Sequence, residues 1–162
     1  MGKSAEELSF LLQCFPKLSK DPDFRITSPD TPDYNCIAWA YNYFDRWMWP
    51  GGTQMKIADG FTYWPDENSS DDVSNFISAF RKKGYELCDS WEHEDGFQKI
   101  ALYTKQGTTE CTHAARELTQ GKDCGKWTSK LGRFHDIRHT NPYTIEGDAY
   151  GVVHCIMKRV FK

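Results

Sequence analysis

The chain has 162 residues, of which 39% are apolar and 15% aromatic, enough core material for one folded domain and too much for a disordered chain. Lysine and arginine number 20 against 23 aspartate and glutamate residues, giving a net charge of −3. This balance argues against a nucleic-acid-binding protein, which usually carries a concentrated basic surface. No apolar run approaches the roughly 18 residues that span a membrane, so no membrane partner is expected.

The N-terminus and the cysteines indicate a cellular compartment. No basic start followed by an apolar core is visible, so we expect a cytoplasmic protein; export by a route without a cleaved signal peptide is the alternative. The six cysteines, at positions 14, 36, 88, 111, 124 and 155, show no two-residue spacing. This spacing gives no zinc or redox motif, so no metal and no cofactor are expected. Because no signal peptide is visible, we expect the thiols to be free.

The first half of the chain is predicted to be helical. Residues 1–34 are expected to form a helix over 4–18 and then an extended loop. Residues 35–84 form the helical part, with one helix from near Asn35 and another over 71–83. The cap candidates of these two helices are Asp33 or Asn35 and Asp71 or Asp72, and their stops are Pro50 and Gly84.

The second half, residues 85–162, changes to the pattern of strands. Because helices come first and an antiparallel meander follows, the predicted fold class is α+β in a single domain over 1–162. The segment 121–162 has an excess of basic residues, so this basic C-terminal face is a candidate surface for a protein partner. The candidate strands cover 85–90, 99–104, 110–118, 126–130 and 151–160.

The sharpest local signal is the stretch from Tyr34 to Ala40, YNCIAWA. Cys36 falls in the first turn of the second predicted helix, where unpaired N–H groups and the helix dipole favour a negative charge. A thiol in this position has a lowered pKa and is a better nucleophile. The backbone N–H of Cys36 and the Asn35 side chain are the candidates for binding an oxyanion. The alternative is that Cys36 packs as a small apolar residue.

A thiol nucleophile also needs a base and a group that orients this base. His113 is the candidate base, because it stands on a predicted strand between small neighbours and follows Cys36 along the chain. The alternative is a structural histidine in a strand.

A cysteine at a helix start, a His-Ala pair on a strand and then a Trp-containing strand resemble the papain-like superfamily. Here the pair is His113-Ala114, and the Trp-containing stretch runs from Lys126 to Gly132. The resemblance implies a papain-like α+β fold, with N-terminal helices packed on a C-terminal antiparallel sheet. It places the residue that orients the histidine at Ser129 or Lys130, where papain has Asn. Ser129 and, if the loop folds back, Asp136 are the candidates for this role.

A second register resembles the NlpC-type cell-wall peptidases, which share this fold. Lys99 to Tyr103 is similar to their histidine-bearing strand, and Thr112 to Ala114 is similar to the strand that follows. In this register Lys99 replaces the catalytic histidine and His113 becomes the orienting residue. A lysine does not support ordinary base chemistry unless it is strongly desolvated.

The whole chain also resembles an uncharacterised bacterial domain family. The resemblance covers about residues 15–160 and implies one module without an established activity. Its signatures are the YNCIAWA, KIALY, THAAR and SKLG stretches, Tyr63-Trp64-Pro65 and the closing strand Tyr150-Gly151-Val152-Val153.

Two other patterns compete for a function. His135 and His139 have the i, i+4 spacing of zinc ligands on a helix, but no helix is evident there, so no metal site is expected. Trp47, Trp49 and Trp64 lie near turns and are candidates, together with Lys99, for contacting a substrate; the alternative is that these aromatic residues belong to the core.

The sequence therefore predicts a cysteine-dependent hydrolase or acyltransferase for a peptide, protein or amide substrate. Cys36 attacks, His113 transfers the proton, and Ser129 or Asp136 steadies the imidazole. The alternative is a non-catalytic binding or interaction module on the same fold.

Overall fold

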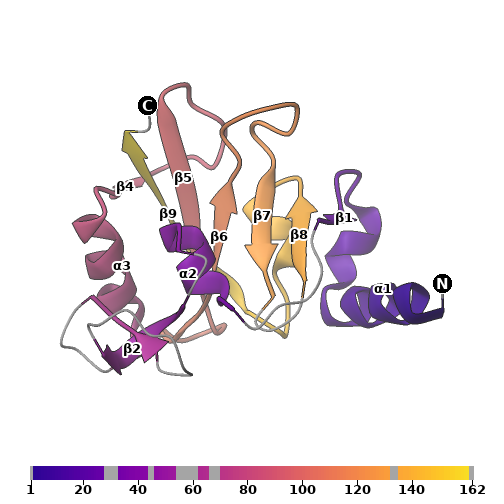
Figure 1. The fold of residues 1–162 in the computed structure, drawn as a ribbon, viewed down its shortest axis with the longest axis horizontal. Helices are drawn as coiled ribbons and strands as arrows, with labels where there is room; N and C mark the ends of the chain where they lie inside the picture. Colours follow the sequence, from indigo (N-terminus) through magenta and orange to yellow (C-terminus); the bar gives the residue numbers. More distant parts are fainter. Residues whose placement is uncertain are drawn as a thin grey trace.

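The computed structural model describes residues 2–27, 33–43, 46–53, 62–65, 70–131 and 135–160. Within these ranges it is an α+β structure of three α-helices, a seven-stranded antiparallel sheet and a separate pair of short strands, which confirms the predicted class (Figure 1). No helix in these ranges has both the length and the apolarity needed to cross a membrane.

The N-terminal helix α1, Gly2–Cys14, lies beside the edge of the sheet formed by strands β1, Arg25–Ile26, and β8, Asp136–His139 (Figure 1). The sequence predicted one helix over 4–18, but the chain changes at Pro16 to a 3-10 helix, η1, over Pro16–Lys20. Proline has no N–H to donate to the preceding turn, which accounts for the break. The short strand β1, Arg25–Ile26, then pairs with β8 inside the segment predicted as loop.

Helix α2 covers only Cys36–Tyr41, far less than predicted, because Asn42 adopts a left-handed conformation with φ 73° and ends it. The side chain of Asn35 caps its first turn. The chain then forms strand β2, Trp47–Thr53, which pairs in parallel with β3, Thr62–Tyr63. These two strands were not predicted.

Helix α3, Val73–Lys82, confirms the predicted helix over 71–83. The carboxylate of Asp72 caps it by accepting a hydrogen bond from the N–H of Ser74 at 3.1 Å. Gly84 follows the helix with φ 97°, a conformation that glycine adopts without steric cost. The apolar stripe of α3, which includes Phe76 and Phe80, is buried.

The seven strands lie in the order β1-β8-β7-β6-β5-β9-β4. Strands β5, β6 and β7 pair in the predicted order, but β9 inserts between β4 and β5, and β8, which pairs with β7, was not predicted. Strand bounds are β4 Glu86–Cys88, β5 Phe97–Thr104, β6 Cys111–Glu117, β7 Trp127–Lys130, β8 Asp136–His139 and β9 Val152–Val160, with a 3-10 helix, η2, over Pro142–Ile145.

The two faces of the sheet bury separate apolar clusters. We call the face that packs on α2 and α3 the α2 face; its cluster includes Leu102 and Ala114. The opposite face carries the cluster that includes Tyr103 and Ala115, together with residues of α1 and η1. Because successive side chains of a strand point to opposite faces, these assignments fix the direction of the residues between them.

Candidate functional site

Cys36 lies at the start of α2, as predicted, but its side chain faces the core. The residue is 7% exposed and belongs to the apolar cluster of the α2 face. Burial raises the pKa of its thiol to about 11, although hydrogen bonds from the backbone of Ala114 and Ile37 and the charge of Lys130 act in the opposite direction. The thiol is therefore protonated at neutral pH.

His113 lies on the opposite face of the sheet. It pairs in register with Tyr103, its ring stacks on Tyr150 at a centroid distance of 4.0 Å, and it is 0% exposed. Neither ring nitrogen has a hydrogen-bond partner among the described residues, so the expected contact with Cys36 is not formed. Desolvation, with a smaller effect of His139, lowers the pKa of His113 well below its usual value.

The two candidates for orienting His113 are engaged elsewhere. The buried Ser129 lies on the same face as His113, but its hydroxyl lies 2.9 Å from Nε2 of His139. Asp136 lies on the α2 face, where its carboxylate accepts a hydrogen bond from the hydroxyl of Tyr34 at 2.9 Å. The four predicted catalytic residues are thus divided between the two faces.

A basic residue does face Cys36, and it is Lys130. Its ammonium lies 5.3 Å from the ring centroid of Tyr34, and its charge acts on the Cys36 thiol. The sequence offered Lys130 only as a residue in the position of the papain asparagine. Alternation along β7 places Lys130, and not Ser129, on the face of α2.

Asn35 was predicted to bind an oxyanion, but its side chain is used in the fold. Its Oδ1 accepts hydrogen bonds from the N–H of Ala38 and the N–H of Met48, each at 3.1 Å, and its Nδ2 donates to the carbonyl of Met48 at 2.9 Å. The amide therefore caps α2 and ties it to β2.

Replacing Asn35 by alanine is expected to lower the free energy of unfolding by about 2 kcal/mol, because two buried polar groups of Met48 lose their partner and the helix loses its cap. The matched control is Asn141→Ala, which removes one exposed cap bond, to Tyr143 N–H, and is expected to cost less than about 1 kcal/mol. Urea unfolding measures both. Equal losses would show that the bonds to Met48 contribute nothing.

The residues predicted to contact a substrate lie at separate places. Trp64 is fully buried against Phe76, with a centroid distance of 5.1 Å, and so belongs to the core. Trp49 packs on the same ring at 5.2 Å, and Trp47 is half-buried in β2. Lys99 is buried and donates from Nζ to the carbonyls of Ser90 and Glu92, both at 2.7 Å.

The histidines at 135 and 139 are also held separately. His139 faces Ser129, whereas Nε2 of His135 lies 2.8 Å from a carboxylate oxygen of Glu7. Within the described ranges no group of three or more His, Cys, Asp or Glu side chains has the geometry to hold a metal ion.

Three described basic residues of 121–162 lie at separate places. Lys126 pairs with Asp23 at 2.9 Å, whereas Lys130 is buried beneath α2. Lys158, on β9, pairs with Glu94, also at 2.9 Å. The use of this segment as a surface for a protein partner stays a prediction.

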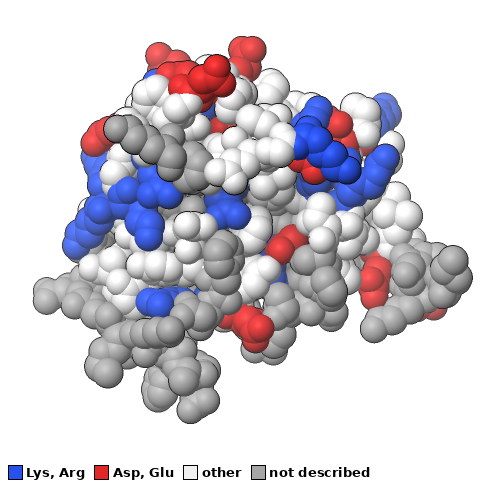
Figure 2. Space-filling view, turned by 45° about the horizontal axis from the view of Figure 1, so that its top comes forward, with Lys and Arg blue, Asp and Glu red and all other residues white. Residues whose placement is uncertain are grey.

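A different group of cations gathers around Tyr43, just after α2. Nζ of Lys83 lies 4.4 Å and Cζ of Arg46 4.3 Å from the centroid of this ring. Desolvation by burial lowers the pKa of Lys83, and the charges of Arg159 and Arg46 lower it further. We call Tyr41, Tyr43, Arg46, Lys83 and Arg159 the cation–tyrosine patch; Figure 2 shows lysine and arginine gathered on the left side of the molecule, where α3, β4 and β9 lie in Figure 1.

These features define an α+β domain in which a short helix that starts at a buried cysteine packs on an antiparallel sheet. The chain belongs to the family DUF7689, a domain of unknown function, whose model matches residues 25–158. The match covers β1 to β9 up to residue 158 and leaves α1 and η1 outside. No curated protein and no solved structure was found to match the chain.

Proposed function

We propose that this domain is a non-catalytic interaction module with a papain-like arrangement of helix on sheet, and that it binds an acidic segment of a protein partner at the cation–tyrosine patch. The observation that supports it most is the position of Lys83 and Arg46, since Nζ of Lys83 and Cζ of Arg46 lie 4.4 and 4.3 Å from the centroid of the same ring, that of Tyr43. Like charges held together at a half-buried site cost free energy, and a carboxylate from a partner relieves this repulsion.

The chemistry of the patch also suits a peptide partner. Tyrosine and arginine are enriched in protein interfaces, where they give contact area and charge-assisted hydrogen bonds. In the described part of the chain Lys83 has no ion pair, and its ammonium contacts the rings of Tyr41 and Tyr43. An aspartate or glutamate side chain that reaches Lys83 forms an ion pair that is partly shielded from water.

The arrangement of Cys36 and His113 supports a binding role over thiol catalysis. A thiol hydrolase needs the sulfur and the imidazole within hydrogen-bond reach, or within one small movement of it. Here a β-sheet separates them, and both groups are buried as neutral species.

The test uses a fluorescein-labelled peptide of ten glutamates and, as its neutral match, ten glutamines. We expect fluorescence anisotropy to show binding of the glutamate peptide only, weakened as salt is raised from 50 to 300 mM, because salt screens exposed charges. Lys83→Glu is expected to weaken binding about tenfold, since it replaces an attraction by a repulsion. The control Lys122→Glu changes an exposed lysine in the turn between β6 and β7 and is expected to have a much smaller effect.

Two results would contradict the proposal. Equal binding by both peptides, or equal effects of the two lysine variants, would remove the patch as the recognition site. Rapid alkylation of Cys36 by iodoacetamide, slowed by His113→Ala, would instead favour thiol catalysis.

A further inference from the structure

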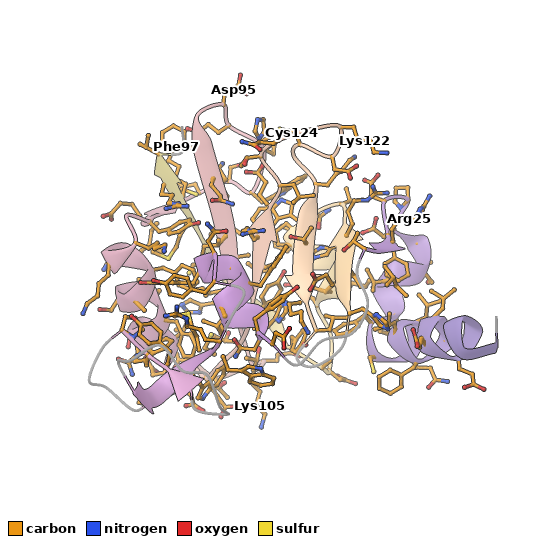
Figure 3. The ribbon with its side chains drawn as sticks, viewed as in Figure 1. Arg25, Asp95, Phe97, Lys105, Lys122 and Cys124 are labelled. Carbon is orange, nitrogen blue, oxygen red and sulfur yellow. The ribbon has the colours of Figure 1, made fainter. Side chains whose placement is uncertain are left out.

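The thiol of Cys124 lies beside an imidazole, at the end of the sheet that is farther from β2. Cys124 stands in the turn between β6 and β7, and His93 in the loop between β4 and β5. The sulfur lies 3.6 Å from Nε2 and 3.9 Å from Nδ1 of His93. Figure 3 shows Cys124 and Asp95 at the same exposed end of the sheet.

The imidazole of His93 is held between two carboxylates. Nδ1 lies 3.2 Å from Oε2 of Glu117, whose side chain is fully buried, and Nε2 lies 3.0 Å from Oδ1 of Asp95, whose side chain is fully exposed. The second oxygen of Glu117, Oε1, has no hydrogen bond among the described residues and is buried beside the ring. The two contacts fix the orientation of the His93 ring beside Cys124.

The two loops that carry His93 and Cys124 are each held in place by hydrogen bonds. Lys99 is buried and donates two hydrogen bonds of 2.7 Å to the carbonyls of the loop that carries His93. On the other side, the N–H of Gly125 donates to the carbonyl of Leu118 at 2.8 Å and closes the turn that carries Cys124. Gly125 also passes close to Cβ of His93. The contact between sulfur and imidazole is therefore set by the fold.

Cys124 differs from the other five cysteines, all of which lie in the described part of the chain. It is exposed, whereas the others are buried or half-buried. Burial raises the pKa of the Cys36, Cys111 and Cys155 thiols, which makes them poor nucleophiles at neutral pH. A small reagent in solution reaches Cys124 without any opening of the structure.

We propose that Cys124 is a reactive thiol that exchanges with low-molecular-weight disulfides, with His93 taking up and returning the proton and Glu117 as a positioning residue. The proton of Cys124 passes to His93, and the thiolate attacks one sulfur of the small disulfide. A new S–S bond forms to Cys124 as the old one breaks, and the departing thiolate takes up a proton from His93. The product is a mixed disulfide on the protein and one free small thiol, with no other oxidant.

Charges of both signs surround this thiol. Asp95 and Glu92 are exposed next to His93, whereas Glu94 is paired with Lys158. Lys122, two residues before Cys124, is exposed as well, and Figure 3 shows it at the same end of the sheet. A small disulfide therefore meets no single sign of charge at this thiol.

The experiment treats the full native chain with cystamine, a small cationic disulfide, and locates the modification by peptide mass spectrometry. At pH 7 we expect Cys124 to react about tenfold or more faster than the half-buried Cys14 and Cys88, since exposure and a neighbouring imidazole both favour attack.

Variants test the roles of the neighbours. His93→Gln is expected to slow the reaction of Cys124 about tenfold at pH 7 and to move the midpoint of its pH–rate profile upward. Glu117→Gln is expected to move this midpoint in the same direction by less, with an unchanged circular dichroism spectrum. His154→Gln, at an exposed histidine of β9, is the control. An unchanged rate in His93→Gln, or equal labelling of Cys14, Cys88 and Cys124, would overturn the proposal.

Discussion

Lowering the pH from 6.5 to 4 is expected to reduce the free energy of unfolding by about 3 kcal/mol through His139 alone, and by more when His113 is included. Burial lowers the pKa of His139 from 6.5 to about 4. A group with a lowered pKa in the folded state binds its proton first in the unfolded state. Its contribution is thus fully present above pH 6.5 and is lost as the pH falls toward 4.

The hydrogen bonds of His139 show why the neutral ring is preferred. Nδ1 lies 2.8 Å from the carbonyl of Asn141 and so donates to it, which leaves Nε2 to accept from the hydroxyl of Ser129. A second proton on Nε2 breaks this bond. His113, whose ring nitrogens make no hydrogen bonds in the described structure, gains nothing from a proton either.

Urea unfolding at pH 7, 6.5, 5 and 4 measures this dependence. His113→Phe keeps a ring between Tyr103 and Tyr150 and is expected to change stability little at pH 7 while reducing the loss between pH 6.5 and 4. His154→Gln, at an exposed site, is expected to leave the dependence unchanged. An identical pH dependence in His113→Phe and the parent chain would mean that His113 is not buried as a neutral ring.

Replacing Gly151 by alanine is expected to lower the free energy of unfolding by about 4 kcal/mol, or to prevent folding, because a buried backbone clash adds to the cost of a left-handed residue. Gly151 has φ 82°, and a Cβ atom on it would lie 2.0 Å from the carbonyl oxygen of Thr104. Relief of this contact requires β5 and the start of β9 to separate where Thr104 pairs with Val152.

The matched control is Gly107→Ala. Gly107 has a similar φ of 79°, but nothing lies within 4 Å of the position of its Cβ. This variant is expected to cost only about 1 kcal/mol, from the backbone conformation itself. Thermal and urea unfolding distinguish the two variants, and equal losses would show that the contact with Thr104 is relieved by small movements.

Where local sequence signals were strong, the elements followed them. Asp72, the apolar stripe that includes Phe76 and Phe80, and Gly84 together define the start, the buried face and the end of α3. In α2 the apolar pattern continues to Phe44, and nothing in the pattern shows that Asn42 adopts a left-handed conformation and ends the helix after six residues.

Two strands were missed because their composition suggests other structures. Strand β2 contains Pro50-Gly51-Gly52, a sequence typical of turns. Strand β8 is only four residues long, and the segment His135 to His139 carries the i, i+4 histidine spacing that is typical of a zinc-binding helix rather than of a strand. The place of β9 between β4 and β5 depends on long-range pairing, which no local pattern indicates.

The candidate site depended on which way one strand faces. The sequence predicts that His113 stands on a strand, but the face it takes depends on the register of β6 with β5, including an irregularity near Cys111. A shift of one residue in a strand exchanges its two faces. The contact between His93 and Cys124 is equally hidden from the sequence, because it joins two loops that meet only after β5, β6 and β7 have paired.

The position of β9 also determines what an incomplete chain exposes during synthesis. Strand β5 pairs with β9 along residues 97–104, and β4 pairs with β9 alone among the described strands. Until residues 152–160 have left the ribosome, the backbone edge of β5 that pairs with β9 has no partner. Because β5 is itself largely apolar, such an edge readily pairs with strands of other chains. A nascent or truncated chain that stops before residue 152 is therefore expected to aggregate more readily than the finished domain.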